Sequence, residues 1–370
     1  MIFKVLFVTD ILKQRSGVAS VMMNYYRNID SKEVHIDFMT WEGNEPAFES
    51  EIKQNGSQIF FMPRLGLTNY FKTKKFFSDF FQLHKGEYQI IHSHFYQMDS
   101  IIFPIAKKNG VKACISHSHN TKYSEYFTKI WRNWLLSRGI KKHADYWAAC
   151  SDLAGTFLFG KKFKESKKSI IINNAIDLSK YAYDVNARNQ IRNEYDLEDK
   201  FVIGNVGSLK PQKNQKFLID VFSVLKSMEE FSNSVLLIVG DGALKQELID
   251  YTQKKGLKDD VIFMGSRNDV HKLLSAMDLF VFPSLFEGLG LTLIEAQCSG
   301  LRCIASNQVP NEAKISDLIS FVPLDNSPLH WATYISQMPN VDRHDYKLTC
   351  NEYDINYAAK RLMDFYKSVV

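Results

Sequence analysis

The feature that most constrains the fold is an alternation, repeated along nearly the whole chain, of short β-rich runs with longer stretches of helical periodicity. The short runs are almost continuous in apolar residues, which is typical of strands buried on both faces of a parallel sheet. Because the strand–helix alternation occurs twice over, the sequence predicts an α/β protein with two doubly wound, Rossmann-like parallel-sheet domains. The expected strands are Phe3–Val8, Val34–Phe38, Ile59–Met62, Ile90–His94, Ala113–His117, Tyr146–Ala149, Ser169–Ile172, Phe201–Val206, Val235–Val239, Val261–Met264, Leu279–Phe282, Arg302–Ala305 and Ile319–Val322.

The boundary between the two domains is expected in the polar stretch 177–199, just before the strand that begins at Phe201. We therefore assign residues 1–180 to a first domain and residues 181–350 to a second domain. The last segment, 351–370, has helical periodicity and no strand after it, so it is expected to return to the first domain. Two such domains would face each other across a cleft at the carboxyl ends of their strands, where open α/β sheets bind ligands.

Composition narrows the class of protein further. Apolar residues make up 45% of the chain and charged residues 24%, which is a globular composition. The apolar start of the chain meets Lys4 and stops at Asp10, so it predicts a buried first strand and not a signal peptide. No apolar run approaches the roughly 20 residues of a membrane span, and the five cysteines show no CxxC spacing. We expect a cytoplasmic protein without disulfides.

Positive charge is concentrated in the first domain. Residues 1–180 carry a net charge of +10 and the remainder −5, within a total of +5. Aromatic residues lie among the lysines of the stretch 70–81. Either these are solvated helix faces over core aromatics, or they form a surface for anionic lipid headgroups or a lipid-diphosphate acceptor at the inner face of a membrane. No nucleic-acid-binding motif accompanies the charge, so no nucleic-acid partner is expected.

The strongest motif follows the expected strand Leu279–Phe282. There the chain turns through Glu287-Gly-Leu-Gly290 and enters a helix that carries Glu295. The glycines allow a ligand to approach the backbone closely, and the free amides that open the helix favour an anion. A carboxylate accepts hydrogen bonds from vicinal hydroxyls, so one glutamate could hold a sugar and the other a ribose. The alternative is a surface carboxylate near a helix start, which the helix dipole alone would favour.

A second motif comes directly after the first strand of the second domain. It reads Gly207-Ser-Leu-Lys-Pro-Gln-Lys213, in which a glycine turn is followed by a lysine that opens a helix. Such a turn is suited to hold a diphosphate by charge and backbone amides together. It is not a Walker sequence, and Lys213 alone could equally be a solvated residue of a first helical turn.

The first domain offers a glycine loop and four histidines. Gly17 lies before the expected helix 21–29, where a phosphate could meet a helix start, although a plain turn is as consistent. The pairs His92 and His94, and His117 and His119, stand at strand ends, where a histidine can act as acid, base or sugar ligand. Their spacing indicates no zinc site. Because no Asp-x-Asp metal motif is present, we expect no metal; Lys213, helix ends and Arg267 would then meet the phosphate charge.

With these motifs, the chain resembles family 4 glycosyltransferases of the GT-B fold, in the branch of capsular or exopolysaccharide synthesis. The resemblance spans essentially the whole chain and rests on two glutamates separated by seven residues, inside Glu-Gly-x-Gly-Leu…Ile-Glu-Ala. Supporting elements are the Gly-Asp-Gly242 stretch, the Phe-Met-Gly-Ser-Arg267 strand end and the opening from Gly17 to Asp30.

The resemblance implies a role for each matching residue. Either His119 or His117 contacts the transferred sugar, His119 being the closer match to the family motif. Relatives often have arginine where this chain has Ser208. The implied catalytic residues are His119, Glu287 and Lys213. The implied donor-binding residues at the phosphates are Gly17, Gly207, Ser208 and Lys213, with Gly17 at the diphosphate. Gly265 and Arg267 would lie beside the base, Glu287 with Gly288, Leu289 and Gly290 at the sugar, and Glu295 at the ribose hydroxyls.

The resemblance also implies a reaction. A retaining enzyme would move a sugar from a nucleoside-diphosphate sugar, with UDP the expected nucleotide, to a hydroxyl of a glycan or lipid-linked glycan. No cofactor or metal is implied. Two other functions remain open: a nucleotide-sugar 2-epimerase on the same fold, and a sugar-binding protein without catalysis.

Overall fold

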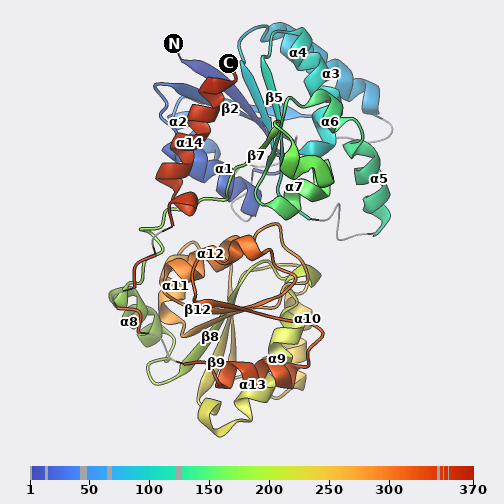
Figure 1. Cartoon of the computed structure of the whole chain (residues 1–370). Helices are drawn as coiled ribbons and strands as arrows, with labels where there is room; N and C mark the ends of the chain where they lie inside the picture. Colours follow the sequence, from blue (N-terminus) through green and yellow to red (C-terminus); the bar gives the residue numbers. More distant parts are fainter. Residues whose placement is uncertain are drawn as a thin grey trace. The chain divides into compact units, whose positions relative to one another are not determined.

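The computed structural model describes residues 2–12, 16–41, 48–64, 69–121, 127–339, 342–344, 346–348 and 350–370. The chain divides into two compact units. The first consists of residues 1–176 together with 351–370, and the second of residues 177–350. Each unit is built around one parallel sheet, as Figure 1 shows.

The first unit contains a seven-stranded sheet in the order β3-β2-β1-β4-β5-β6-β7, with all strands parallel. Its strands are β1 (Phe3–Val8), β2 (Val34–Trp41), β3 (Ile59–Met62), β4 (Ile90–Ser93), β5 (Ala113–Ser118), β6 (Tyr146–Ala149) and β7 (Ser169–Ile171). Its helices are α1 (Gly17–Asn28), α2 (Glu49–Gln54), α3 (Tyr70–Leu83), α4 (Asp99–Lys108), α5 (Phe127–Ser137), α6 (Ile140–His143), α7 (Asp152–Phe159) and α14 (Ile355–Ser368).

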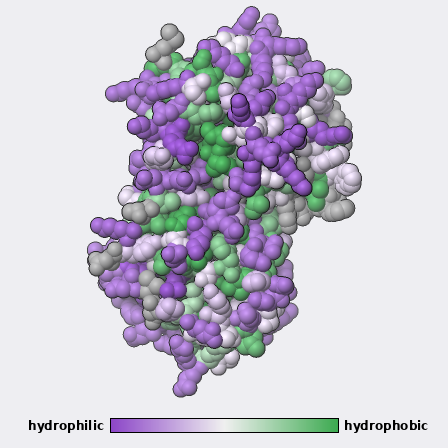
Figure 2. Space-filling view, viewed as in Figure 1, coloured by the Kyte–Doolittle hydropathy of each residue, from purple (hydrophilic) through white to green (hydrophobic). Residues whose placement is uncertain are grey.

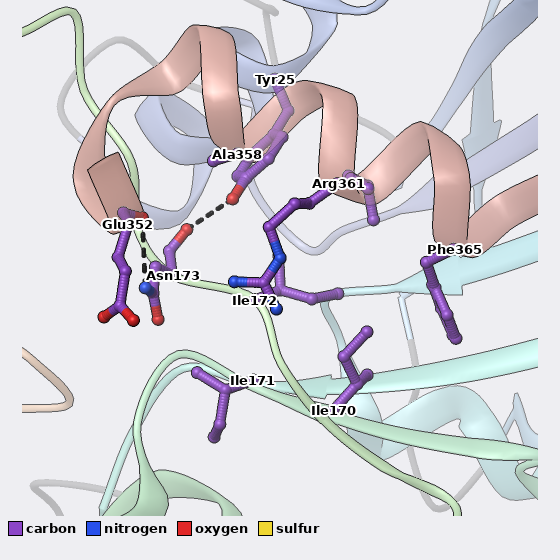
Figure 3. A pocket seen from close by; sticks show the side chains of 10 residues that line it. Tyr25, Ile170, Ile171, Ile172, Asn173, Glu352, Ala358, Arg361 and Phe365 are labelled. Carbon is purple, nitrogen blue, oxygen red and sulfur yellow. Dashed lines mark hydrogen bonds between the residues drawn. The ribbon is translucent and has the colours of Figure 1, made fainter.

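Helix α14 brings the end of the chain back to the first unit. In Figure 1 it lies beside α1 on one side of the sheet, while α4, α6 and α7 lie on the other side. Its apolar face is buried through residues that include Ile355, Leu362 and Tyr366. A cavity of about 210 Å³ lies between α14, α1 and β7. Figure 2 shows an apolar strip in this region of the first unit, and Figure 3 shows the side chains that line the cavity, Arg361 among them.

The second unit contains a six-stranded parallel sheet in the order β10-β9-β8-β11-β12-β13. Helices α9 and α13 pack together, as do α8 and α11. The strands are β8 (Phe201–Val206), β9 (Ser234–Val239), β10 (Val261–Gly265), β11 (Leu279–Phe282), β12 (Arg302–Ser306) and β13 (Ile319–Val322). The helices are α8 (Val185–Glu194), α9 (Gln215–Lys226), α10 (Lys245–Lys254), α11 (Val270–Ala276), α12 (Leu291–Cys298) and α13 (Pro328–Ser336).

Each expected strand is present in the structure, with differences only at the ends. The largest concerns β2, which continues from Phe38 to Trp41 because its last residues still pair with β3. The first helix also differs from the expectation, since it begins at Gly17 and not at Val21. Ser16 caps this helix, and its side chain accepts a hydrogen bond from the amide of Ala19. Gly17 is therefore the first residue of a helix and not part of a loop.

Each sheet reverses its strand order at one place. In the first unit the reversal lies between β1 and β4, and in the second it lies between β8 and β11. The loops that leave the carboxyl ends of two such strands diverge to opposite faces and leave a crevice, the usual ligand site of an open parallel sheet. The motifs of the sequence follow one of these strands or a direct neighbour, except the Gly265–Arg267 segment, which follows the edge strand β10.

Candidate functional site

Lys213 and Glu287 meet at the strand reversal of the second unit. Lys213 follows β8 and Glu287 follows β11, and their Nζ and Oε1 atoms lie 2.6 Å apart. The Lys213 ammonium also lies 4.5 Å from the centroid of the Phe282 ring. Both side chains are largely buried, with 15% and 8% of the side chain exposed. Two residues that are 74 positions apart thus form a charged pair in a partly desolvated site.

The loop after β8 is built to place Lys213. A short 3-10 turn, Pro211–Lys213, ends at Asn214, which adopts a left-handed conformation with φ of 54°. Gly207 lies against the aliphatic part of Lys213, where an added Cβ would stand 3.2 Å from the lysine Cε. Gln212 ties this loop to the β11 loop, because its carbonyl accepts a hydrogen bond from the amide of Leu285 at 2.8 Å. The two loops therefore hold the ion pair from both sides.

Glycines of the neighbouring β9 loop make this arrangement possible. A Cβ on Gly240 would stand 1.9 Å from the carbonyl oxygen of Gly207, and a Cβ on Gly242 would stand 2.3 Å from that of Leu209. The Gly-Asp-Gly242 stretch is thus explained by the close approach of two backbones. Ser208 contributes its carbonyl, which accepts a hydrogen bond from Gln215 at 3.2 Å.

The turn after Glu287 opens helix α12. Gly290 is its N-cap residue with φ of 89°, a left-handed conformation that favours glycine. Leu289 is buried in this turn, so the peptide groups from Gly288 to Gly290 are held in place by packing. The free amides at the start of α12 can bind an anion or a hydroxyl oxygen.

Glu295, in the second turn of α12, is a buried carboxyl group. Burial raises its pKa to about 7, and a hydrogen bond with Tyr181 and the charge of Lys180 act in the opposite direction. Burial also raises the pKa of the Tyr181 hydroxyl, so the phenol stays neutral and donates to the carboxylate. The sequence motifs did not identify Tyr181, which no pattern in its neighbourhood distinguishes.

The segment after β10 carries Gly265 and Arg267. Gly265 has φ of 65° and ends the strand. The guanidinium of Arg267 donates to both carboxylate oxygens of Asp269, at 2.9 and 2.7 Å, and to the hydroxyl of Tyr195 at 3.3 Å. In this structure Arg267 is thus held by an acidic side chain of the same loop, which orients it but also balances its charge.

In the first unit, Gly17 opens helix α1 directly after its cap residue Ser16, and residues 13–15 lie outside the described part of the chain. Nothing described lies within 4 Å of the position that a Cβ on Gly17 would take. Packing of the described residues therefore does not require glycine here, and its backbone is open to approach from outside.

The four strand-end histidines form one cluster. His92 and His94 project from the same face of β4 and its end, and His117 and His119 do the same for the adjacent β5. His92 Nε2 lies 3.0 Å from His117 Nδ1, and His94 Nδ1 lies 2.8 Å from His119 Nε2. The rings stack, with centroids 4.1 Å apart for His117 and His119. Tyr366 extends the cluster from α14, since its hydroxyl lies 2.6 Å from His92 Nδ1.

The cluster is electrically neutral near pH 7. Burial lowers the pKa of His92 to about 3 and that of His119 to about 4. Burial and the neighbouring imidazoles hold the pKa values of His94 and His117 well below the ordinary value. Each ring therefore carries one N–H, and each contact within the cluster joins an N–H to a nitrogen lone pair.

Three of these imidazoles are also the candidate metal ligands among the described residues. One nitrogen from each of His92, His94 and His117 lies within 4.8 Å of the others. Nitrogen ligands of a tetrahedral zinc ion stand about 3.3 Å apart and must point at one centre. Here the rings of His92 and His117 are nearly parallel, at 13°, and are joined by a direct hydrogen bond. This geometry is that of a hydrogen-bonded stack.

Comparison with known proteins places the chain in a family. Residues 187–318 match the family described as "Glycosyl transferases group 1". The putative glycosyltransferase EpsF of Bacillus subtilis (strain 168) is 30% identical over 329 residues, covering 87% of this chain and 84% of that protein. A UDP-Gal:alpha-D-GlcNAc-diphosphoundecaprenol alpha-1,3-galactosyltransferase of Escherichia coli is 28% identical over 309 residues, covering 79% and 76%.

A solved structure supports the fold. The crystal structure of Anabaena HepE in complex with UDP-glucose matches with a TM-score of 0.76 and 18% identity, covering 99% of both chains. Two parallel-sheet α/β units of this kind make up the GT-B fold, which confirms the predicted fold class. The stretch that matches the family, residues 187–318, includes the two-glutamate motif of the second unit. The chain therefore belongs to the group 1 glycosyltransferases.

Proposed function

We propose that this enzyme transfers a sugar, with retention of anomeric configuration, from a UDP-sugar to a hydroxyl of a glycan or lipid-diphosphate-linked glycan in surface polysaccharide synthesis. The observation that carries the proposal is the buried pair of Lys213 and Glu287 at the β8–β11 reversal. A cation and a hydrogen-bond acceptor held together in a ligand crevice suit the two halves of a sugar diphosphate.

Lys213 and Glu287 neutralise each other in this structure. When the donor binds, the ammonium turns to the diphosphate and stabilises the charge that develops on the leaving group. The carboxylate of Glu287 then accepts hydrogen bonds from sugar hydroxyls, with the amides from Gly288 to Gly290 beside it. Because Lys213 and the helix start supply the positive charge, the reaction requires no metal.

The remaining donor contacts of this proposal are assigned from the sequence motifs. Glu295 accepts from the ribose hydroxyls, for which its contact with Tyr181 must open. The segment from Gly265 to Arg267 lies beside the base, and Gly207 and Ser208 lie beside the phosphates. For the first unit, the proposal assigns Gly17 to the diphosphate and His119 or His117 to the transferred sugar.

The names of relatives support the choice of donor, acceptor and process. The HepE structure contains UDP-glucose, and the Escherichia coli relative is named for a UDP-galactose donor and a diphosphoundecaprenol acceptor. A third relative, CapH of Staphylococcus aureus, is named for capsular polysaccharide biosynthesis and is 28% identical over 316 residues, covering 82% of this chain and 85% of that protein.

A lipid-linked acceptor would bring the enzyme to the inner face of a membrane. No described helix is long and apolar enough to cross a bilayer. The first unit instead exposes aromatic side chains on two helices: Phe71 on α3 is 83% exposed, and Trp131 on α5 is 67% exposed. Aromatic rings beside lysines such as Lys72 and Lys74 favour the interface of an anionic bilayer. Peripheral contact with such a membrane completes the proposal.

One experiment separates the proposed function from its alternatives. Nucleotide sugars are first screened by thermal shift, because a ligand stabilises the state that it binds. UDP release is then measured with and without a lipid-diphosphate-linked acceptor, and the product anomer is determined by NMR. Acceptor-dependent UDP release with an anomer matching the donor supports the proposal. Epimerised donor without acceptor would establish the 2-epimerase instead, and binding without UDP release would establish a sugar-binding protein.

A further inference from the structure

A tyrosine near the end of the chain is hydrogen bonded to the histidine cluster. Tyr366 is fully buried on α14, and its hydroxyl lies 2.6 Å from Nδ1 of His92 on β4. The other nitrogen of His92 lies 3.0 Å from Nδ1 of His117 on β5. Three side chains from three elements thus form one linear chain of hydrogen bonds, which ends at Nε2 of His117. That nitrogen is buried and has no partner among the described residues.

The positions of the protons along this chain follow from the number of available hydrogens. His92 and His117 are neutral, so each carries one N–H. The described contacts of the Tyr366 hydroxyl offer its proton one acceptor, the His92 ring. Either polarity leaves one buried proton without a described partner, on the Tyr366 hydroxyl or on Nε2 of His117. A phenol is a stronger hydrogen-bond donor than a neutral imidazole N–H, and an imidazole nitrogen is a stronger acceptor than a phenol oxygen, so the contact of 2.6 Å favours O–H···N. The phenol therefore donates to Nδ1, His92 carries its proton on Nε2, and that proton is donated to Nδ1 of His117.

We infer that Tyr366, acting through His92, fixes His117 in the tautomer that carries its proton on Nε2. The carboxyl end of β5 then presents a hydrogen-bond donor of defined direction for sugar transfer. The functional half of this inference rests on the proposed role of the strand-end histidines at the sugar. Tyr366 and His92 are positioning residues, because they act only through His117. The His119 ring stacks on the His117 ring, with centroids 4.1 Å apart. With the opposite polarity His117 would present a bare lone pair and could only accept.

The first measurement reads the tautomer directly and does not depend on activity. The full chain is labelled with ¹⁵N at its ten histidines, and long-range ¹H–¹⁵N spectra assign the tautomers, with the His117→Gln variant identifying the His117 signals. We expect the Nε2–H form for His117 in the parent protein and a mixture of both forms in Tyr366→Phe. An Nδ1–H tautomer in the parent, or an unchanged spectrum in Tyr366→Phe, would overturn the inference. Zinc binding would also overturn it: if the parent protein binds one equivalent of zinc and His117→Gln does not, the imidazole lone pairs hold a metal and are not used in these hydrogen bonds.

The second measurement connects the tautomer to turnover. Tyr366→Phe should lower kcat on the order of tenfold with little change in donor KM, since a wrong tautomer impairs the reaction more than the binding. The matched control is Tyr25→Phe on α1: Tyr25 is also buried, and its hydroxyl donates to the carbonyl of Asn173 at 2.7 Å without reaching the histidines. An equal loss of kcat in both variants would assign the effect to packing and overturn the inference. If no donor and acceptor support transfer by the parent protein, the proposed function fails while the tautomer measurement stands.

Discussion

At the scale of single residues, the polar groups of the proposed donor site are held by partners within the same unit. Lys213 is paired with Glu287, the Glu295 carboxylate accepts from Tyr181, and Arg267 donates to Asp269. The two ion pairs avoid the cost of a buried, uncompensated charge. The neutral Tyr181 offers Glu295 a hydrogen bond only, in keeping with the raised pKa of that carboxyl group. A donor must therefore exchange these contacts for its own.

Replacing Lys213, the cation of the Lys213–Glu287 pair, tests the part of this lysine in the reaction. We expect Lys213→Met to lower kcat/KM by a factor of about 10² to 10³, because the leaving diphosphate loses its main source of positive charge. Stability should fall as well, since the carboxylate of Glu287 remains largely buried without its ammonium partner. Steady-state kinetics measures the first effect and urea denaturation the second. Lys216→Met is the control, because Lys216 is exposed on α9 and lies over the Tyr251 ring; a comparable loss there would contradict the assignment.

Glu295 should make stability depend on pH. Its pKa is raised to about 7 from an ordinary value of 4.5, so between these values the folded protein binds more protons than the unfolded chain. Stability from this group is complete below pH 4.5 and is lost as the pH rises through 7, by about 3 kcal/mol in total. Asp99, whose pKa is also raised to about 7 by burial, titrates in the same range. The free energy of unfolding is therefore compared with that of Glu295→Gln at each pH, and a constant difference from pH 4.5 to 8 would contradict the expectation.

At the scale of elements, regular structure could be predicted because its causes are local. A strand buried on both faces is a continuous apolar run, so each strand of the two sheets was predicted to within a few residues. The start of α1 at Gly17 was missed, because it depends on the cap that Ser16 provides. The contact of Lys213 with Glu287 joins loops 74 positions apart, and that of His92 with Tyr366 joins positions 274 apart. Such pairs follow from strand order and helix packing, which periodicity does not reveal.

Gly240, in the loop after β9, tests how this loop and the loop after β8 are held together. Gly240→Ala would place a Cβ 1.9 Å from the carbonyl oxygen of Gly207, at a φ of 139°. The backbones must separate, and we expect a loss of about 2–4 kcal/mol in the free energy of unfolding together with weaker donor binding. Gly256→Ala is the control: φ is 72°, but nothing lies within 4 Å of its Cβ, so about 1 kcal/mol is expected from the conformation alone. Equal losses measured by urea denaturation would contradict the close-approach argument.

At the scale of the whole molecule, each unit has its own core, but only the second unit is formed by one continuous segment of the chain. The second unit is continuous, from residue 177 to 350, whereas the first needs residues 351–370 to complete it. Helix α14 contributes the buried side chains of Ile355, Leu362 and Tyr366 to that unit. Each such side chain stabilises by about 1.5–3 kcal/mol, and together they approach the total stability of an ordinary domain, about 5–15 kcal/mol.

Deletion of residues 351–370 should therefore unfold the first unit and leave the second intact. In pulse proteolysis over a urea series, we expect peptides of residues 1–176 to be cleaved at much lower urea than in the full chain, while a fragment of residues 177–350 resists as before. Deletion of residues 369–370 alone is the control, because α14 ends at Ser368. A first unit that stays resistant without α14 would show that its core is complete within residues 1–176. Loss of resistance in both units would show that the second unit also draws its stability from this helix.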